Sequence, residues 1–464
     1  MAEYYVSPSG DDGNAGTIGA PWYSINHAWT VVGAGDTVWM RGGTYSYTEQ
    51  QYLTGVNGSS GNLVKIWAYS GEVPIISKGG SWSWTSHRAL IWFVGNYIHF
   101  KGLTVTGNTN VDTYVWMAMY GHNFNNCILE HCEFSWSGLG AYMDGASSGN
   151  LFLNCDWHNN YDPYSNYENA DGINFEQVDA GGTNTFTGCR CWNNSDDGFD
   201  FYGNQSFIQM TNCWAWGNGF QEDQSSLGGD GNGFKLGSAS VTSTAHLRTL
   251  NNCVSFGNYH WGIDDNGSDC QMKIFNCITH ANGHGQLYVG GYHLNAPVAH
   301  YIRNCVSFDD SDVTCELDGG YNTNIDHNSW DIPITVTSAD FVSITDSQLA
   351  GARDASGGLP VMTYLHLVTA SDLKAAGIAI SGLTLDGDGN SWLDPPSLGA
   401  FEFGTAPPAS VPNTTTFSLQ DVCNVIQPSV NNLVTCFTEA DSASFDPTYE
   451  GDMTSLYNFR NYNG

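Results

Sequence analysis

A cysteine recurs along the middle of this chain at a spacing that constrains the fold more than any other feature. Seven of the thirteen cysteines are spaced by 24 to 40 residues, at positions 127, 155, 189, 213, 253, 277 and 305. Six of these seven follow an asparagine directly, and a second asparagine lies five residues after five of them, at positions 160, 194, 218, 258 and 282. Repeats of about this length are typical of solenoids. We therefore interpret the cysteines as a stack of small buried side chains, not as ligands or disulfide partners.

The composition of the repeats indicates which solenoid forms. They lack the leucine spacing of leucine-rich repeats and are rich in Val, Ile, Phe, Thr and Asn, which favours an all-β parallel β-helix. Strand-like runs at 63–68, 89–94 and 97–105 are interpreted as earlier coils. Apolar residues at helical spacing predict a short amphipathic helix at 21–32, and we expect it to cap the N-terminal end of the solenoid.

The repeats weaken after Cys305. Segments 332–336 and 341–344, followed by a short helix at 371–376, are expected to close the body near Phe403. We therefore predict a β-helix domain over residues 1–403, a Pro/Thr-rich linker at 404–416 and a short C-terminal module at 417–464. Cys423 and Cys436 lie in this module and could pair with each other.

The charge balance excludes several classes of partner. The chain has 13 Lys and Arg against 46 Asp and Glu, a net charge of −33. Nucleic acids and anionic membranes attract positively charged surfaces, so neither is expected as a partner. No apolar run reaches the length of a membrane span, and the first residues, Met1-Ala2-Glu3-Tyr4, do not resemble a secretory signal.

A recurring glycine aligns four segments and brings polar residues into register. The segments begin at Asp171, Asp197, Asn232 and Trp261, and each continues with a glycine, an apolar residue and then a further residue. Because strand side chains alternate, the apolar residue should point inward and the next one outward. The outward residues are Asn174, Asp200, Lys235 and Asp264, which we expect to form one column with about 5 Å between neighbours. Loops 157–170 and 220–231 leave the same face and are expected to wall a cleft.

Four carboxylates gather on two adjacent coils of this arrangement: Asp171, Asp196, Asp197 and Asp200. Like charges this close repel one another unless a cation lies among them. An all-oxygen, highly anionic set of ligands suits a hard cation, and its loose geometry suits Ca²⁺ better than Mg²⁺. The competing interpretation is a solvated acidic cluster of the kind that any acidic protein carries.

Lys235 is the one lysine between Lys101 and Lys273, and it falls in the outward column beside Asp200. It has two interpretations: a surface ion pair of little energetic value, or a general base. A nearby bound cation would lower the pKa of the lysine, whereas Asp200 and Asp264 would raise it. The spacing alone leaves both interpretations open.

Three motifs resemble polysaccharide lyase family 9, the right-handed β-helix pectate lyases: Asn169-Ala-Asp-Gly172, Asn194-Ser-Asp-Asp-Gly-Phe-Asp200 and Gly229-Asp-Gly-Asn-Gly-Phe-Lys-Leu-Gly237. Stretches near both ends of the body, 5–45 and 396–403, are also similar to that family, so the resemblance covers about residues 4–403. It implies Ca²⁺ held by Asp171, Asp196, Asp197 and Asp200, and Lys235 as the base. The implied reaction is β-elimination on an acidic polysaccharide of the polygalacturonate type, carried out outside the cell.

Few other cations are available to hold the carboxylates of such a substrate. Arg248 and Lys273 are the candidates we name, together with Arg190 and Arg303, and any of them could serve as an ordinary surface charge instead. The aromatic residues Trp214, Trp216, Tyr259 and Trp261 could stack on sugars, although packing is the more common role for such residues.

Two other functions remain open at this stage. Polygalacturonases of glycoside hydrolase family 28 share the fold and carry an Asp, an Asp-Asp pair and Gly-His-Gly. Asp171 and Asp196-Asp197 resemble the first two, but the third place holds Gly231-Asn-Gly233, and Gly283-His-Gly285 comes about two coils later. The second alternative is a non-catalytic adhesin or virion-borne spike with a structural cation site, because the last residues are weakly similar to bacteriophage C-termini. A spike would be a trimer.

Overall fold

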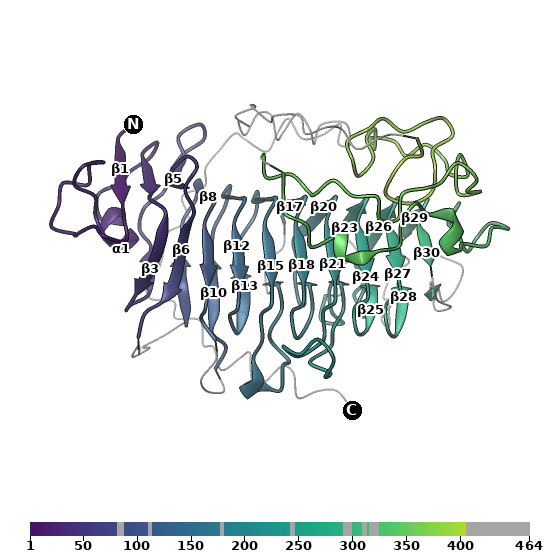
Figure 1. The fold of residues 1–464 in the computed structure, drawn as a ribbon, viewed down its shortest axis with the longest axis horizontal. Helices are drawn as coiled ribbons and strands as arrows, with labels where there is room; N and C mark the ends of the chain where they lie inside the picture. Colours follow the sequence, from purple (N-terminus) through teal and green to yellow (C-terminus); the bar gives the residue numbers. More distant parts are fainter. Residues whose placement is uncertain are drawn as a thin grey trace.

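The body of the molecule is a long coil of short parallel strands, shown in Figure 1. This computed structural model describes residues 1–80, 88–109, 114–176, 181–241, 246–290, 299–308, 313–314, 324–354 and 356–404. Each complete coil contributes one strand to each of three sheets in turn, for example β17, β18 and β19. All strand pairs in these sheets are parallel and in register, so the predicted parallel β-helix is confirmed.

The first sheet, which we call the long sheet, has twelve strands. In spatial order they are β1 (Glu3–Val6), β2 (Thr37–Met40), β5 (Val64–Ala68), β8 (Ile98–Lys101), β11 (Ile128–Glu130), β14 (Leu151–Leu153), β17 (Thr183–Thr187), β20 (Phe207–Thr211), β23 (Leu247–Asn251), β26 (Gln271–Phe275), β29 (Tyr301–Arg303) and β32 (Ile325–Asp326).

The other two sheets have ten strands each. The strap sheet consists of β3 (Gly43–Tyr47), β6 (Pro74–Lys78), β9 (Thr104–Thr106), β12 (Glu133–Ser135), β15 (Asp156–His158), β18 (Arg190–Trp192), β21 (Trp214–Trp216), β24 (Val254–Phe256), β27 (Ile278–His280) and β30 (Val306–Phe308). The site sheet consists of β4 (Gln51–Leu53), β7 (Ala89–Phe93), β10 (Met117–His122), β13 (Leu139–Asp144), β16 (Ile173–Phe175), β19 (Phe199–Asp200), β22 (Phe234–Lys235), β25 (Trp261–Asp264), β28 (Gly285–Tyr288) and β31 (Val313–Thr314).

Five of the six asparagine-cysteine pairs, from Asn154-Cys155 onward, form the corner between the long sheet and the strap sheet. Asn126-Cys127 lies one corner earlier, between β10 and β11, and Cys132 takes the place predicted for Cys127. The asparagines before the cysteines adopt left-handed backbone conformations, with φ of 56° at Asn126 and 55° at Asn212, and asparagine tolerates this region better than most residues. The cysteine that follows is buried, and its thiol donates to a carbonyl of the preceding coil, as from Cys155 to Leu129 at 3.3 Å. The ten cysteines of the described residues are all buried free thiols, which confirms their role as internal packing.

The second asparagine series forms a buried hydrogen-bonded ladder at the corner between the strap sheet and the site sheet. Each amide nitrogen donates to the amide oxygen one coil further on, at 2.8 to 3.0 Å, in the order Asn160, Asn194, Asn218, Asn258 and Asn282. Each amide oxygen also accepts from a backbone N–H of the preceding coil, as Asn218 Oδ1 does from the Asn194 N–H at 3.1 Å. The ladder therefore fixes the corner that leads directly into the site sheet.

The N-terminal coils follow the predicted strands with one exception. Run 97–105 is two strands, β8 and β9, because Gly102 turns the chain with φ of 70°. The predicted helix is shorter than expected: α1 spans Ile25–Trp29, and the Ser24 hydroxyl accepts from the His27 N–H at 3.0 Å. It lies at the N-terminal end of the coil (Figure 1), and its role as a cap remains a prediction.

The segment after β32 differs from the prediction, because it folds back over the coil instead of adding to it. Residues 332–336 form no strand, and 371–376 form turns in place of the predicted helix. Short 3-10 helices lie at η2 (Ser338–Asp340) and η3 (Asp346–Gln348). We call residues 330–403 the strap, since its apolar residues Phe341, Leu349, Tyr364 and Phe401 cover the strap sheet in one hydrophobic cluster. This segment therefore buries its apolar residues on the strap sheet instead of forming further coils.

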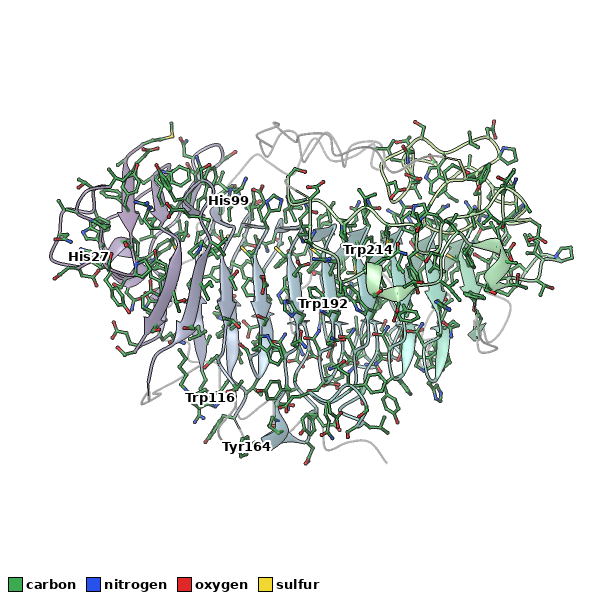
Figure 2. The ribbon with its side chains drawn as sticks, viewed as in Figure 1. His27, His99, Trp116, Tyr164, Trp192 and Trp214 are labelled. Atoms are coloured by element: carbon green, nitrogen blue, oxygen red, sulfur yellow. The ribbon has the colours of Figure 1, made fainter. Side chains whose placement is uncertain are left out.

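The strap covers aromatic residues and is held by a buried ion pair. Figure 2 shows Trp192 and Trp214 on the sheet beneath it, and Trp214 is 2% exposed. Packing, not sugar binding, is therefore the role of Trp214. Arg353 of the strap contacts Asp156 at 2.6 Å, and Asp156 also receives a bidentate contact from Arg190 at 2.8 Å.

Two predictions concern parts that the structure does not cover. The linker beyond Gly404 and the module at 417–464, with its two cysteines, lie outside the described residues. Among the described residues, no helix has the length and apolar character needed to cross a bilayer.

Candidate active site

The site sheet places the predicted outward column in register. Asn174 pairs with Asp200, Asp200 with Lys235 and Lys235 with Asp264. The apolar residue that directly precedes each of them in the chain is buried in the core. The column is nevertheless buried, with Lys235 only 3% exposed and Asp200 fully enclosed. Loop 220–231 contacts the column directly, because Asp230 Oδ2 lies 3.0 Å from Lys235 Nζ. The charges of the column therefore interact at a lower effective dielectric than they would at an open surface.

Glycines before the inward residues allow this close stacking. A Cβ on Gly198 would lie 2.6 Å from the carbonyl oxygen of Gly233, and one on Gly172 would lie 2.7 Å from that of Gly198. Both distances are too short for any other residue. The recurring glycine that aligned the sequence is thus required by the approach of successive coils.

The four predicted carboxylates form two overlapping groups that share Asp197. Oxygens of Asp171, Asp197 and Asp200 lie within 4.8 Å of one another, and so do those of Asp196, Asp197 and Asp230. Asp196 is therefore not in the same group as Asp171, because consecutive residues direct their side chains differently. Asp230 was not predicted from the sequence, since only the fold of its loop brings it to the cluster.

One buried oxygen beside the acids, Asn174 Oδ1, takes no part in their hydrogen bonds. The Asp171 carboxylate accepts from the Asp197 N–H and from the Asn174 amide, both at 3.1 Å. The Asn174 Oδ1 atom is buried and accepts no hydrogen bond within the described part of the chain. A buried amide oxygen beside three carboxylates makes an all-oxygen donor set, which fits a hard divalent cation such as Ca²⁺.

Lys235 lies between the two acidic groups. Its Nζ atom is 2.8 Å from Asp197 Oδ2, 3.0 Å from Asp230 Oδ2 and 3.6 Å from Asp200 Oδ2. Asp197 is held in turn by Asn232, whose backbone and side-chain nitrogens donate to Asp197 Oδ1 at 2.6 and 2.9 Å. One carboxylate therefore links the lysine to the candidate cation ligands.

Asp264, the last residue of the outward column, has a strongly raised pKa. Burial, followed by the charge of neighbouring Asp265, raises its pKa to about 8. Asp264 is therefore largely protonated at neutral pH, and it does little to hold Lys235 in the charged form. Burial also lowers the pKa of His260, which lies near Asp197 and Lys235, and the charge of His284 lowers it further.

Known proteins are similar to this chain in sequence and in fold. The family model for the Pel9A-like right-handed β-helix region matches residues 4–296. The chain belongs to this family. Pectate lyase L of Dickeya dadantii (strain 3937) is 31% identical over 407 residues, covering 86% of this chain and 90% of that protein. Pectate lyase PEL9 of Emericella nidulans is 30% identical over 393 residues, covering 78% and 92%.

The structural comparison agrees with the sequence comparison. The crystal structure of pectate lyase Pel9A matches with a TM-score of 0.71 and 29% identity, over 87% of this chain and 97% of that one. Like the rest of the Pel9A-like family, the chain is a right-handed parallel β-helix, and it is a polysaccharide lyase of the pectate lyase type. This result favours the lyase over the hydrolase and the non-catalytic adhesin.

The two cations that the sequence suggested for substrate binding lie on strands of the long sheet, not of the site sheet. Arg248 is fully buried, and its guanidinium donates to the carbonyls of Leu236, Asn204 and Ser206 at 2.5 to 2.8 Å. Its hydrogen bonds thus hold the backbone of neighbouring turns together. Lys273 lies on β26 in the long sheet, whereas Lys235 lies in the site sheet. We do not include either residue in the proposed site.

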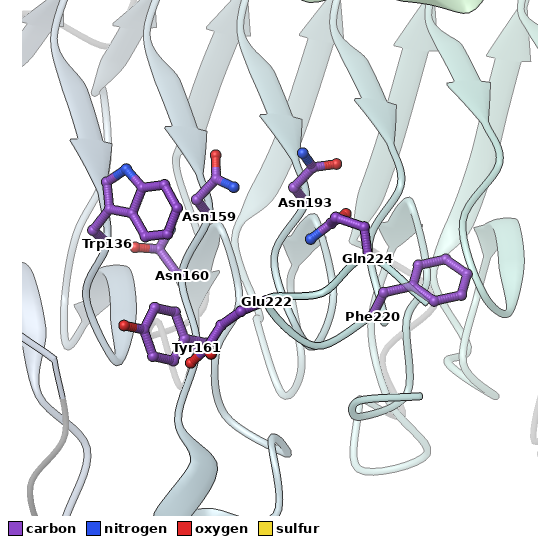
Figure 3. Close-up of a pocket in the computed structure, with 8 residues that line it drawn as sticks. All are labelled: Trp136, Asn159, Asn160, Tyr161, Asn193, Phe220, Glu222 and Gln224. Atoms are coloured by element: carbon purple, nitrogen blue, oxygen red, sulfur yellow. The ribbon is translucent and has the colours of Figure 1, made fainter. Parts of the chain in front are cut away.

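A shallow pocket lies between the two loops that were expected to wall a cleft (Figure 3). Its lining comprises Trp136, Asn159, Asn160, Tyr161, Asn193, Phe220, Glu222 and Gln224. Asn159, Asn160 and Tyr161 come from loop 157–170, and the last three residues come from loop 220–231. The pocket is at the corner that the asparagine ladder forms, and neither Lys235 nor the acids line it.

Proposed function

We propose that this enzyme cleaves a pectate-like polyuronate by calcium-dependent β-elimination, with Lys235 as the base. The observation that carries the proposal is the position of Lys235 Nζ, 2.8 Å from a carboxylate that belongs to the candidate cation site. A base and an acidifying cation must act on adjacent atoms of one sugar, and this geometry would hold both at one point of the site sheet. Pectate as substrate rests on the names of the relatives.

The cation would be held by Asp171, Asp197, Asp200 and the oxygen of Asn174. Asp196 would either reach the same cation through another side-chain conformation or bind a second ion. When bound, Ca²⁺ would neutralise the sugar carboxylate and acidify the proton on the adjacent C5 carbon. It would also offset part of the repulsion between an anionic polymer and a chain of net charge −33.

Lys235 must be unprotonated to act. In the structure its partners Asp197, Asp200 and Asp230 stabilise the ammonium form. Once Asp197 and Asp200 serve as cation ligands, their charge no longer holds the proton on the lysine, and burial then favours the neutral amine. The amine takes the C5 proton, the C–H electrons form the C4–C5 double bond, and the C4–O4 bond breaks with O4 receiving a proton from water.

The test is the near-ultraviolet absorbance of polygalacturonate incubated with the enzyme, with added Ca²⁺ and with a chelator. The double bond conjugated to the carboxylate absorbs, so the proposal predicts rising absorbance that the chelator abolishes and added Ca²⁺ restores. New reducing ends without absorbance would indicate hydrolysis and refute the proposal. We expect this activity to be extracellular, where such polymers occur.

A further inference from the structure

The motif Gly283-His284-Gly285 has no part in the proposed elimination, yet the structure builds it into a cluster of rings beside the site. The His284 N–H donates to the His260 carbonyl at 3.1 Å, and the two imidazoles stack with centroids 4.5 Å apart. The Trp261 ring meets His284 edge-on at 4.8 Å and lies 5.2 Å from the Tyr288 ring. We call these four residues, His260, Trp261, His284 and Tyr288, the ring cluster.

The glycine on either side of His284 shapes this cluster. A Cβ on Gly285 would come within 2.0 Å of the Trp261 ring, so only glycine lets the indole lie over the backbone of β28. A Cβ on Gly283 would meet the Tyr259 carbonyl at 2.4 Å. His284 is exposed and Trp261 is 8% exposed, so the imidazole is held at the surface above a supporting indole.

A hydrogen-bond chain orients His260 relative to the acids. The Asn232 amide nitrogen donates to Asp197, and its oxygen accepts from the Trp261 N–H at 3.2 Å, which fixes the orientation of the amide. His260 Nδ1, 3.1 Å from that same oxygen, must therefore be the donor. In the neutral imidazole, Nε2 then carries a lone pair that can accept from a hydroxyl group.

We propose that the ring cluster binds one sugar unit of the acidic polysaccharide, on the side of Lys235 opposite Asp171. This inference rests on the proposed function. β25 and β28 are one and two strands beyond β22 in the site sheet, which places His260 and Trp261 about 5 Å, and His284 and Tyr288 about 10 Å, along the coil axis from Lys235. Aromatic rings pack against the C–H faces of sugars, and the imidazoles supply hydrogen bonds to hydroxyl and carboxylate oxygens. None of the four side chains is an acid, so the cluster does not itself repel a uronate.

The polymer would then run along the coil axis, across the outward column. One part would lie over Asp171 and Asp200, the bond to be cleaved over Lys235, and a later sugar over the ring cluster. The alternative is that the four rings pack only against one another and bind no sugar. The two interpretations differ in whether an exposed imidazole contributes to binding.

The experiment measures binding of hexagalacturonate and digalacturonate by calorimetry in the presence of Ca²⁺, using Lys235→Ala so that no substrate is consumed. Adding His284→Ala should weaken binding of the hexamer about tenfold, as expected for the loss of one stacking or hydrogen-bonding contact. The dimer, which is too short to span from the acids to the cluster, should change less than twofold. His284→Gln should recover part of the affinity for the hexamer. His327→Ala, which removes a half-exposed imidazole beside Asp326 near the end of the long sheet, serves as the control and should bind as before.

The outcomes separate this inference from the proposed function. Equal binding of the hexamer with and without His284, or no binding of it at all, overturns the ring cluster as a sugar site. Equal losses for the two oligosaccharides overturn its position along the polymer. If the wild-type enzyme forms no unsaturated product but hexamer binding still depends on His284, the elimination is refuted and the sugar site stands.

Discussion

Asn218 lies in the middle of the asparagine ladder, and replacing it should lower the stability of the protein by a measurable amount. Its amide oxygen accepts from the N–H and the amide of Asn194 at 3.1 and 3.0 Å, and its amide nitrogen donates to Asn258 at 2.8 Å and to the Cys191 carbonyl at 3.3 Å. Asn218→Ala removes all of these bonds and leaves the Asn194 N–H and the Cys191 carbonyl buried without these partners. At about 1–3 kcal/mol for each buried group left unpaired, we expect a destabilisation of about 4 kcal/mol.

Urea denaturation followed by tryptophan fluorescence measures this loss as a fall in the transition midpoint. The matched control is Asn62→Ala, at an exposed turn, which should change the free energy of unfolding by less than about 0.5 kcal/mol. Asn194 directly precedes the turn that carries Asp196 and Asp197, so Asn218→Ala should also reduce the activity. A loss of less than 1 kcal/mol would show that the ladder is not a main support of the corner.

Three further predictions follow from single contacts. Because the pKa of Asp264 is about 8 in the folded state against an ordinary value of 3.8, its ionisation favours unfolding as the pH rises between these values, so wild-type stability should decline there. Asp264→Asn should flatten this decline by up to about 1.4 kcal/mol per pH unit in thermal melts, and parallel curves would contradict the assignment. Arg353→Met should loosen the strap by about 3 kcal/mol, seen as faster limited proteolysis within 340–360; an unchanged rate would exclude the ion pair as its anchor. Gly198→Ala should separate β19 from β22 and reduce elimination more than tenfold, whereas full activity would show that the coils can yield at this point.

The coil and its central column could be predicted from the sequence because each depends on a repeated local rule. Cysteine and asparagine recur once per coil, and the glycine fixes the register of the strands, so Asn174, Asp200, Lys235 and Asp264 align without any knowledge of distant contacts. Strand alternation also gave their direction correctly. Their burial was not predicted, because it depends on contacts outside the repeat, such as that of Asp230 with Lys235.

Features that depend on segments without a repeat could not be predicted in this way. The strap has no repeat, and its path depends on apolar contacts such as those of Phe341 and Tyr364 with the strap sheet. The carbonyl contacts of Arg248 could not be predicted either, because burial decides whether a guanidinium meets solvent or backbone carbonyls. Asp230 joins the lysine only through the fold of its glycine-rich loop, although the motif around it was already visible.

The most direct test of the central claim compares two lysine variants under saturating Ca²⁺. The initial rate of absorbance increase on polygalacturonate should fall at least a hundredfold for Lys235→Ala, the usual scale for loss of a general base, and stay within twofold of wild type for Lys273→Ala. Because both variants remove one positive charge, a difference between their rates reflects the position of the lysine and not the change in net charge. A Lys235→Ala enzyme that keeps its folded spectrum and eliminates at a rate near that of wild type would contradict the assignment of the base.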